Sequence, residues 1–252
     1  MTVFSIVIPM KNEAGNVRRL VEEIDEACRS LPAFDLVIVD DGSDDETGEI
    51  ARGLTAGGRP VRVLRHDESA GQSAAVHSGV QIAEGEFIVT LDGDGQNPPS
   101  EIPKLIAPLL DPNRDSRLGL IAGQRVGRQD TWSKKYASRF ANGLRNRVLK
   151  DGTRDTGCGL KAFRRDAFLA LPFFNHMHRY LPALFARDGW SVGHVDVSHR
   201  SRGEGRSNYS NLQRALVGIP DLIAVAWLIR RRKTRNSMAD ILTTQSREGT
   251  ET

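Results

Sequence analysis

Two aspartates two positions apart, Asp92 and Asp94, directly follow an apolar segment that ends at Leu91. At the end of a strand the pleat can direct both carboxylates to one side, and the intervening Gly93 lets a ligand approach the backbone. Paired carboxylate oxygens suit Mg²⁺ or Mn²⁺, which keep positions open for phosphate oxygens. A solvated acidic turn is the alternative. The apolar segment before the pair, and Gln96 and a proline turn after it, favour the metal site.

The elements that position this pair follow from the apolar pattern. Continuous segments rich in β-branched residues are typical of strands buried on both faces, and the first half of the chain has four: Val3–Ile8, Leu36–Val39, Val61–Leu64 and Phe87–Leu91. Helical patterns separate them: Asn16–Cys28, Asp44–Leu54 and Ala70–Ala83. This alternation predicts a parallel sheet. Ligands bind at the carboxyl ends of such strands, so Pro9–Glu13 and Asp40–Ser43 should lie near the aspartate pair.

Several classes of protein are excluded. With 39% hydrophobic and 27% charged residues, the 252-residue chain can bury a proper core and is not intrinsically disordered. Neither a dinucleotide fingerprint nor a phosphate loop of the GxxxxGK[ST] type is present. Cys28 and Cys158 are too far apart in sequence for a zinc or redox motif and are expected to be small buried hydrophobes. A net charge of +3 is too slight to demand a nucleic acid partner.

The second half has a mixed pattern with no linker before it. We expect a strand at 118–123, a basic helix over Trp132–Leu149, a loop over Asp151–Gly159 and a strand over Ser191–Val197. The longest apolar stretch, Leu216–Ile229, contains Pro220 and is shorter than the ~20 residues of a membrane-spanning helix. The opening residues also lack the features of a signal peptide, so no membrane crossing is expected.

Six motifs in a fixed order resemble the family 2 glycosyltransferases, which have the GT-A fold. They are Phe4–Glu13, Val39–Asp44, Asp92–Pro99, Gly123–Arg125, Asp155–Arg165 and His199–Tyr209. More narrowly, the set is similar to the polyprenyl-phosphate glycosyltransferases, relatives of dolichol-phosphate mannose synthase. The resemblance implies an α/β fold with a mostly parallel sheet flanked by helices, and an inverting hexosyltransferase.

The same resemblance implies a domain plan. Residues 1–235 form a single GT-A domain, with a nucleotide-binding half at 1–117, an acceptor half at 118–210 and an amphipathic, basic helix at 211–235. Residues 236–252 form a polar tail.

The resemblance also assigns roles to individual residues. The implied nucleotide contacts are Pro9, Asn12, Glu13, Asp41 and Asp92, with Asp44 rather than Asp41 capping the following helix. The implied metal ligands, for Mg²⁺ or Mn²⁺, are Asp92, Asp94 and Gln96. The implied catalytic residues are Asp94, Arg125 and Asp155, with Arg125 expected to fork onto phosphate. The implied acceptor-phosphate residues are Arg200, Arg202, Arg206 and Ser207. Gly93, Gly95 and Asn208 depart from the usual pattern of the family.

The acceptor follows from what is missing. A sugar hydroxyl needs a general base, whereas a phosphate monoester, with its second pKa near ~6, is already a dianion at neutral pH. The acidic pair of hydroxyl-accepting relatives and the QxxRW of polymerising ones are both absent. This favours a polyprenyl (undecaprenyl-type) phosphate acceptor and a single transfer. As the donor, the resemblance favours a UDP-sugar over a GDP-sugar. Two alternatives stay open: a sugar-hydroxyl acceptor with Asp155 as base, and a catalytically silent module that binds nucleotide sugar.

A lipid acceptor requires a membrane surface. Residues 200–235 carry nine basic and two acidic side chains, a net charge of +7. A helix over Leu216–Ile229 that ends in the cluster Arg230–Arg235 indicates an interfacial helix on an anionic leaflet, and a core-packed helix with a solvated end stays equally open. We therefore expect a peripheral enzyme on the cytoplasmic face of the inner membrane. Self-association or a membrane-protein partner is compatible with this.

The histidines carry no clear metal signal. His66, His77 and His194 are expected to be structural because none pairs with another at metal-ligand spacing. His176 and His178 lack a third ligand. Their segment resembles the acceptor-side helix of the family, in which Arg179 and Tyr180 would face the lipid head.

Overall fold

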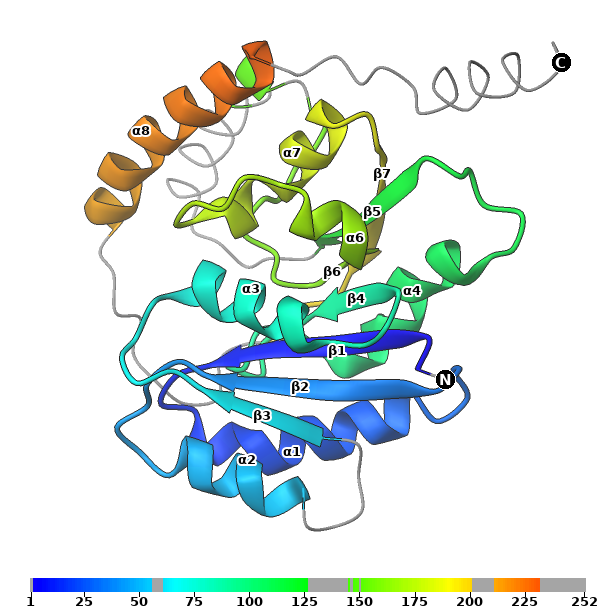
Figure 1. Ribbon diagram of the computed structural model, residues 1–252, viewed down its shortest axis with the longest axis vertical. Coiled ribbons are helices and arrows are strands. Elements are labelled where there is room, and N and C mark those ends of the chain that lie inside the picture. Colours follow the sequence, from blue (N-terminus) through cyan, green and yellow to red (C-terminus); the bar gives the residue numbers. More distant parts are fainter. Residues whose placement is uncertain are drawn as a thin grey trace, which may run out of the picture.

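The computed structural model describes residues 2–55, 61–126, 145, 147–149, 151–200 and 211–231, with the backbone alone for 211–217. In the described chain one sheet has seven strands in the order β3-β2-β1-β4-β6-β5-β7 (Figure 1). Their bounds are β1 Phe4–Met10, β2 Phe34–Asp40, β3 Val61–Arg65, β4 Phe87–Thr90, β5 Leu118–Arg125, β6 Lys161–Arg164 and β7 Ser191–Val197. The sheet therefore runs through both halves of the sequence.

The sheet is mostly parallel, as predicted. β1 pairs in parallel with β2 and β4, β2 with β3, and β5 with β7, whereas β6 is antiparallel to both β4 and β5. All predicted strands are present, with ends that differ by two residues at most. The pattern did not predict β6, which inserts between β4 and β5. Because β6 runs in the opposite direction, the segment that leads into it lies at the edge where the parallel strands end.

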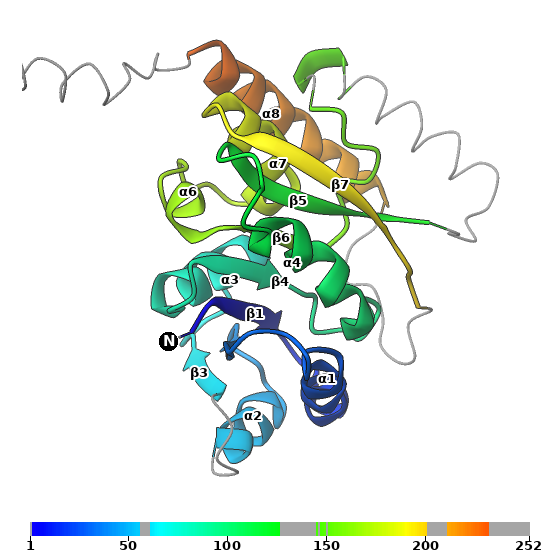
Figure 2. The same cartoon turned by 90° about the vertical axis from the view of Figure 1, so that its right-hand side faces the viewer.

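Helices cover both faces of the sheet (Figure 2). One face packs against α1 Ala14–Ala27, α2 Thr47–Thr55, the single turn η1 Pro99–Glu101 and α4 Ile102–Leu110. The other packs against α3 Gln72–Ile82, α6 Arg165–Leu169, the turn η2 Met177–Arg179, α7 Leu181–Arg187 and α8 Asn211–Arg230. Since both faces are covered, the strands are continuously apolar and not alternating.

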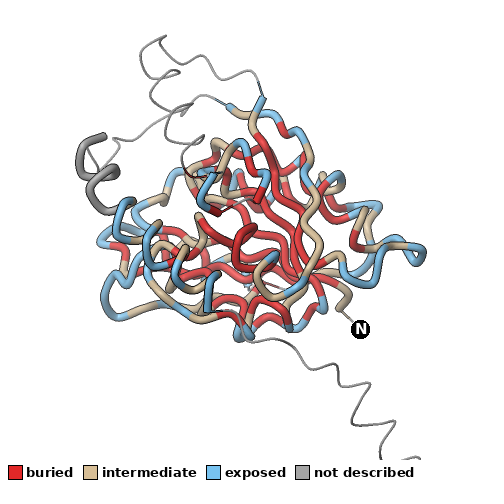
Figure 3. The backbone as a smooth tube through the Cα atoms, turned by 90° about the horizontal axis from the view of Figure 1, so that it is seen from above, coloured by how far each residue is buried: buried red, intermediate tan, exposed pale blue. Residues whose placement is uncertain are grey.

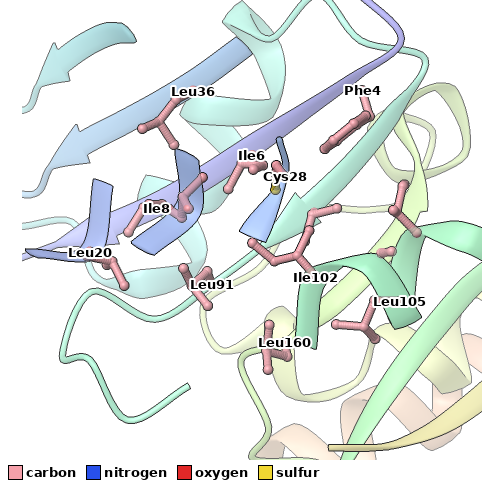
Figure 4. Close-up of a cluster of buried hydrophobic side chains, with 14 of the residues drawn as sticks. Phe4, Ile6, Ile8, Leu20, Cys28, Leu36, Leu91, Ile102, Leu105 and Leu160 are labelled. Atoms are coloured by element: carbon pink, nitrogen blue, oxygen red, sulfur yellow. The ribbon is translucent and has the colours of Figure 1, made fainter. Parts of the chain in front are cut away.

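The hydrophobic core lies on both sides of β1. Ile6 and Ile8 are fully buried against Leu20 of α1 and Ile102 of α4 on one face (Figure 4), while Val7 packs on the opposite face against α3. Figure 3 shows that the buried residues follow the strands through the centre of the molecule.

Both cysteines are free and buried, as expected of small hydrophobes. Burial, with a smaller contribution from Asp25, raises the pKa of Cys28 to about 12.

Two local predictions for the first half need correction. The helix expected to start at Asp44 starts at Thr47, and Asp45 rather than Asp44 caps it by accepting the N–H of Thr47 at 3.0 Å. Asp44 instead donates its own N–H to Oδ1 of Asn12 at 2.9 Å. Asp44 thus belongs to the turn before the helix, because its N–H bonds to a residue 32 positions away. The local sequence does not reveal such a contact.

The basic helix predicted over Trp132–Leu149 falls mainly outside the described residues. Its described residues, Arg145 and 147–149, are helical. Arg145 is buried and forms a bidentate ion pair with Asp151. Asp151 also accepts the N–H of Thr153 at 3.2 Å. This pair ties the helix to the loop that leads toward β6.

A glycine of α3 tests how closely that helix lies on the sheet. A Cβ at Gly79 would stand 2.5 Å from Cγ1 of Val7 and 3.0 Å from Cγ2 of Val39, so Gly79→Ala should destabilise the fold by about 1–3 kcal/mol through overpacking. Gly53→Ala is the matched control, because a Cβ at this helical position of α2 meets nothing within 4 Å. Urea unfolding measures both variants. Equal stabilities would show that α3 does not depend on this close approach.

Candidate active site

The polar segments after β1, β2 and β4 meet at the carboxyl edge of the sheet, as the sequence predicted. The register pairs Met10 with Asp40, and the N–H of Asp41 donates to the carbonyl of Met10 at 2.8 Å. β5 ends at this edge with Arg125. The edge thus brings together carboxylates from two strands and a guanidinium from a third.

Asp41 is a buried carboxylate with donors on every side. It accepts hydrogen bonds from Nδ1 of His66 at 2.8 Å and Oγ of Ser69 at 2.8 Å, and from the N–H groups of Ala70 and Gly71 at 2.9 Å each. Burial opposes ionisation, but these bonds outweigh it and hold the pKa of Asp41 below its ordinary value. The side chain therefore fixes the loop that leads into α3.

Asn12 and Glu13, predicted to contact nucleotide, brace the same edge. Asn12 adopts a left-handed backbone with φ of 56°, and its N–H donates to Oγ of Ser43 at 3.0 Å. The N–H of Glu13 donates to Oγ1 of Thr47 at 2.8 Å. Asn12 is exposed, and Glu13 and Pro9, the latter within β1 directly before Met10, are half-buried, so the end of β1 and the segment after it are accessible at this edge.

Asp92 is held in one orientation by two amide side chains. Oδ1 accepts from Nε2 of Gln72 at 2.7 Å, and Oδ2 accepts from Nδ2 of Asn97 at 3.0 Å. A Cβ at Gly159 would lie 2.1–2.3 Å from the atoms of this carboxylate, so only glycine fits there. Burial, followed by the charge of Asp94, raises the pKa of Asp92.

The donor set at the end of β4 fits a divalent cation. Asp94 accepts the N–H of Gln96 at 3.1 Å through Oδ1, and carboxylate oxygens are ligands suited to such a cation. Burial, and after it the charge of Asp94, raises the pKa of Asp92, and a bound cation would favour the ionised carboxylates against both effects. The described residues contain no cluster of three or more His, Cys, Asp or Glu side chains suited to a metal. Asp92, Asp94 and Gln96 would therefore need oxygen ligands from a substrate.

Arg125 and Asp155, both predicted to be catalytic, lie together as a bidentate pair. Nε of Arg125 is 2.6 Å from Oδ2 and Nη2 is 2.8 Å from Oδ1 of Asp155, and both side chains are largely buried. Burial opposes the charge of Arg125, but the pairing with Asp155 prevails and raises its pKa. The guanidinium fork expected for phosphate is thus directed at a carboxylate of the same chain.

Lys161 is a residue that the sequence reasoning missed. It opens β6, is buried, and donates from Nζ to the carbonyl of Cys158. Burial lowers the pKa of Lys161, while the charges of Cys158, Asp92 and Asp155 act in the opposite direction. The available signal was its position at the end of the DTGCGLK motif, residues 155–161. The local sequence does not show, however, which distant side chains a lysine within a strand will contact.

Of the predicted acceptor-phosphate residues, only Arg200 lies within the described chain. Its N–H donates to the carbonyl of Gln96 at 2.9 Å, and its guanidinium pairs with Glu23 of α1 at 2.7 Å. Arg200 therefore lies beside the aspartate loop. Arg202, Arg206 and Ser207 fall outside the described residues, as do the basic residues after Arg231.

The segment 176–180 lies between α3 and α8. Nδ1 of His178 is 2.7 Å from Oγ of Ser73, and the N–H of His178 donates to the same oxygen at 3.3 Å. His176 pairs with Asp221 of α8 at 3.2 Å, and the hydroxyl of Tyr180 donates to the carbonyl of Gly218 at 3.3 Å. Burial, then the charges of Lys161, Arg179 and His176, lowers the pKa of His178 well below its ordinary value.

The three histidines expected to be structural have partners in the described chain. His66 contacts Asp41 and Ser78, His77 packs on Phe168 and Phe173, and His194 contacts Thr153.

Comparisons with known proteins identify similar sequences. The profile of Glycosyl transferase family 2 matches residues 5–171. The chain is 34% identical over 231 residues to the dodecaprenyl-phosphate galacturonate synthase of Rhizobium johnstonii, covering 90% of this chain and 67% of that protein. It is 34% identical over 208 residues to the undecaprenyl-phosphate 4-deoxy-4-formamido-L-arabinose transferase of Edwardsiella ictaluri, covering 81% and 62%. The chain thus spans about two thirds of the length of these relatives.

Solved structures share the fold at lower identity. Glucosyl-3-phosphoglycerate synthase from Mycobacterium tuberculosis, solved with Mn²⁺ and uridine diphosphate, superposes with a TM-score of 0.67 at 18% identity over 93% of this chain and 82% of that one. Mannosyl-3-phosphoglycerate synthase from Rubrobacter xylanophilus gives 0.68 at 17% identity over 94% and 77%. At such identity the likeness concerns the fold.

The lowered pKa of Asp41 predicts a pH dependence of stability. A carboxylate whose pKa falls on folding stabilises the protein above its unfolded pKa, and this contribution is lost as the pH falls through the folded value. Asp41→Asn should cost about 2 kcal/mol at pH 7. Urea unfolding should then show the gap between the two proteins shrinking from pH 5 to pH 2.5. A gap that does not change with pH would contradict the ionised, hydrogen-bonded Asp41.

Proposed function

The chain belongs to glycosyl transferase family 2, and from that premise we propose that it transfers one sugar from a nucleoside diphosphate sugar to a polyprenyl phosphate. An oxygen of the acceptor phosphate attacks the anomeric carbon while the bond from that carbon to the nucleotide phosphate breaks. The products are the sugar-phosphate lipid, inverted at the anomeric carbon, and the nucleoside diphosphate. A uridine nucleotide is the donor we favour.

The choice of acceptor depends on one observation, the Arg125–Asp155 pair. A hydroxyl acceptor needs a base, and Asp155 is the candidate that the sequence offers. Both of its oxygens accept hydrogen bonds from Arg125, which stabilises the ionised carboxylate and makes it a poor base. A phosphate dianion needs no base. The names of the relatives, which specify dodecaprenyl and undecaprenyl phosphate, support the same acceptor.

We assign binding of the nucleotide-sugar donor to the carboxyl ends of β1, β2 and β4. Pro9, Asn12 and Glu13 form an accessible wall for base and ribose, while Asp41 supports the loop beside it. Asp94, Asp92 and Gln96 would hold a divalent cation. When bound, Mg²⁺ or Mn²⁺ neutralises the two phosphates of the leaving group. Of the proposed acceptor residues, Arg200 follows β7 and lies next to the same loop. Arg202, Arg206 and Ser207 come after it in the sequence, outside the described residues.

The location we propose is the cytoplasmic face of the membrane, with α8 on the lipid surface. No described helix is long and apolar enough to span a bilayer. One side of α8 packs on the core through Val225, Leu222 and Ile229. The other side exposes Ile219, Ile223 and Trp227 by 59%, 65% and 58%.

The charge at the end of this exposed stripe supports an anionic membrane as the surface that it contacts. Arg230 and Arg231 are exposed, and Arg231 lies over the ring of Trp227. An apolar stripe beside cations matches an anionic bilayer, where each nearby cation contributes about 1 kcal/mol. The two interpretations of this helix from the sequence thus describe two sides of one helix: the inner side is core, and the outer side is the proposed interface.

A transfer assay tests the function. Purified protein with Mn²⁺ or Mg²⁺ and undecaprenyl phosphate should transfer labelled sugar from at least one member of a panel of UDP- and GDP-sugars. Asp94→Ala should lower turnover by more than about 100-fold, because it removes a proposed cation ligand. Asp111→Ala is the matched control, since Asp111 ends α4 at the opposite edge of the sheet.

Three outcomes would contradict the proposal. Transfer to acceptors that lack phosphate would support Asp155 as a base. Binding of UDP without turnover under any acceptor would support a catalytically silent module. Equal turnover by Asp94→Ala and wild type would remove the cation site from the mechanism.

Sedimentation with vesicles tests the location. The triple variant Ile219→Ser, Ile223→Ser, Trp227→Ser should lose binding to vesicles of phosphatidylglycerol and phosphatidylcholine while keeping its melting temperature, because these side chains are exposed. Ile82→Ser is the control, because Ile82 is an exposed apolar residue at the end of α3. Salt should weaken wild-type binding. Equal binding by the triple variant and wild type would contradict the proposed interface.

A further inference from the structure

Two adjacent residues at the start of α3 contact the two halves of the proposed reaction. Gln72 donates to Oδ1 of Asp92 at 2.7 Å, on the donor side. Ser73 contacts His178 through both the imidazole, at 2.7 Å, and the backbone N–H, at 3.3 Å, on the acceptor side. Neighbouring residues of a helix point about 100° apart, so one turn can hold two separate elements.

We propose that Gln72 and Ser73 are positioning residues that fix the carboxylate of Asp92 relative to the acceptor-side segment 176–180. The proposal rests on the proposed function, which assigns Asp92 to the donor, and on the resemblance of segment 176–180 to the acceptor-side helix of the family. Neither residue was singled out by the sequence.

α3 is suited to this role because it is fixed along its whole length. Before its start, the N–H groups of Ala70 and Gly71 donate to Asp41 at 2.9 Å. In its middle, Gly79 brings the helix against Val7 and Val39 of the sheet. At its end, Arg165 donates to the carbonyls of Val80 and Gln81 at 2.9 and 2.8 Å. A helix that cannot shift can hold two other elements at a constant separation.

The contacts with Ser73 define the state of His178. The oxygen of Ser73 accepts the N–H of His178, and its hydroxyl hydrogen is available for Nδ1. Burial and neighbouring cations keep this imidazole neutral, in agreement with Nδ1 as an acceptor. The bond therefore fixes both the backbone and the ring of the acceptor-side segment.

Gln72 differs from Ser73 because its partner is a charged group, the carboxylate of Asp92. Asp92 has a like-charged neighbour in Asp94 and is enclosed by Gly159, so its orientation depends on its amide partners. Gln72 supplies one of them from outside the β4 loop, and Asn97 supplies the other from within it. Loss of Gln72 leaves Asn97 as the amide partner of Asp92.

The experiment separates the two contacts by what each variant binds. Calorimetry with Mn²⁺ and UDP, with no acceptor present, should show binding about fivefold weaker for Gln72→Ala and unchanged for Ser73→Ala. Calorimetry with a short-chain polyprenyl phosphate in detergent should show the reverse. Ser73→Thr, which restores the hydroxyl, should recover acceptor binding.

Matched controls lie elsewhere in the fold. Gln81→Ala removes an exposed glutamine from the other end of α3, and Ser191→Ala removes a serine bonded to Asp115 at the start of β7. Both should bind donor and acceptor as wild type does.

Turnover tests the coupling. Each single variant should lower kcat about tenfold, and the double variant should lose much less than the product of the two losses, because breaking either contact already frees the two halves from each other. Multiplicative losses would overturn the coupling. Parallel weakening of donor and acceptor binding in both variants would show that α3 is only structural.

These results are separable from a failure of the proposed function. If the wild type transfers no sugar, the function fails, while the two binding titrations still decide the roles of Gln72 and Ser73. Unchanged Mn²⁺–UDP binding by Gln72→Ala would overturn its assignment regardless of turnover.

Discussion

The carboxylate of Asp92 sets the constraint that the rest of the site satisfies. It is enclosed at the end of β4 beside Asp94, and burial together with that like charge raises its pKa. Such a group must be compensated by oriented donors and nearby cations. Three segments provide them: Gln72 from α3, Asn97 from the turn that follows Asp92, and Lys161 from β6. The antiparallel insertion of β6 matters for this reason, since a strand that starts at the carboxyl edge can bring Gly159 and Lys161 against the end of a parallel strand.

A second constraint follows from the first. A carboxylate held by α3 keeps its orientation only if α3 itself is fixed, and Asp41 does this by accepting the N–H groups that precede the helix. Asp40, its neighbour, accepts the N–H of Ser43 at 3.0 Å and lies 3.3 Å from Nη1 of Arg65. The paired aspartates after β2 therefore shape the edge from within. Direct contact of Asp41 with a nucleotide base remains a prediction, and it would have to share a carboxylate that already has four protein donors.

The sequence predicted the strands and their common edge because each has a local signature. Apolar segments such as Leu36–Val39 mark buried strands, and parallel topology then places the residues that follow them together. It did not predict β6, whose four residues include a lysine and an arginine and form no apolar run. It also missed the pairing of Arg125 with Asp155, 30 residues apart, and of Ser73 with His178, 105 apart. Contacts at such separations depend on the tertiary fold and leave no periodic trace in the chain.

The proposed membrane face and the aspartate edge are joined by a short series of contacts. α8 is held to the segment 176–180 by Asp221 with His176 and by Gly218 with Tyr180. The same segment contacts Ser73 through His178, and the neighbouring Gln72 contacts Asp92. A lipid whose tail stays in the bilayer presents its phosphate at a height set by the membrane surface. If the exposed side of α8 rests on that surface, as proposed, the depth of α8 would fix the height of segment 176–180, and α3 would relate that height to the carboxylates. Hydrogen bonds within the protein would then set the distance between the lipid phosphate and the donor that the proposed reaction requires.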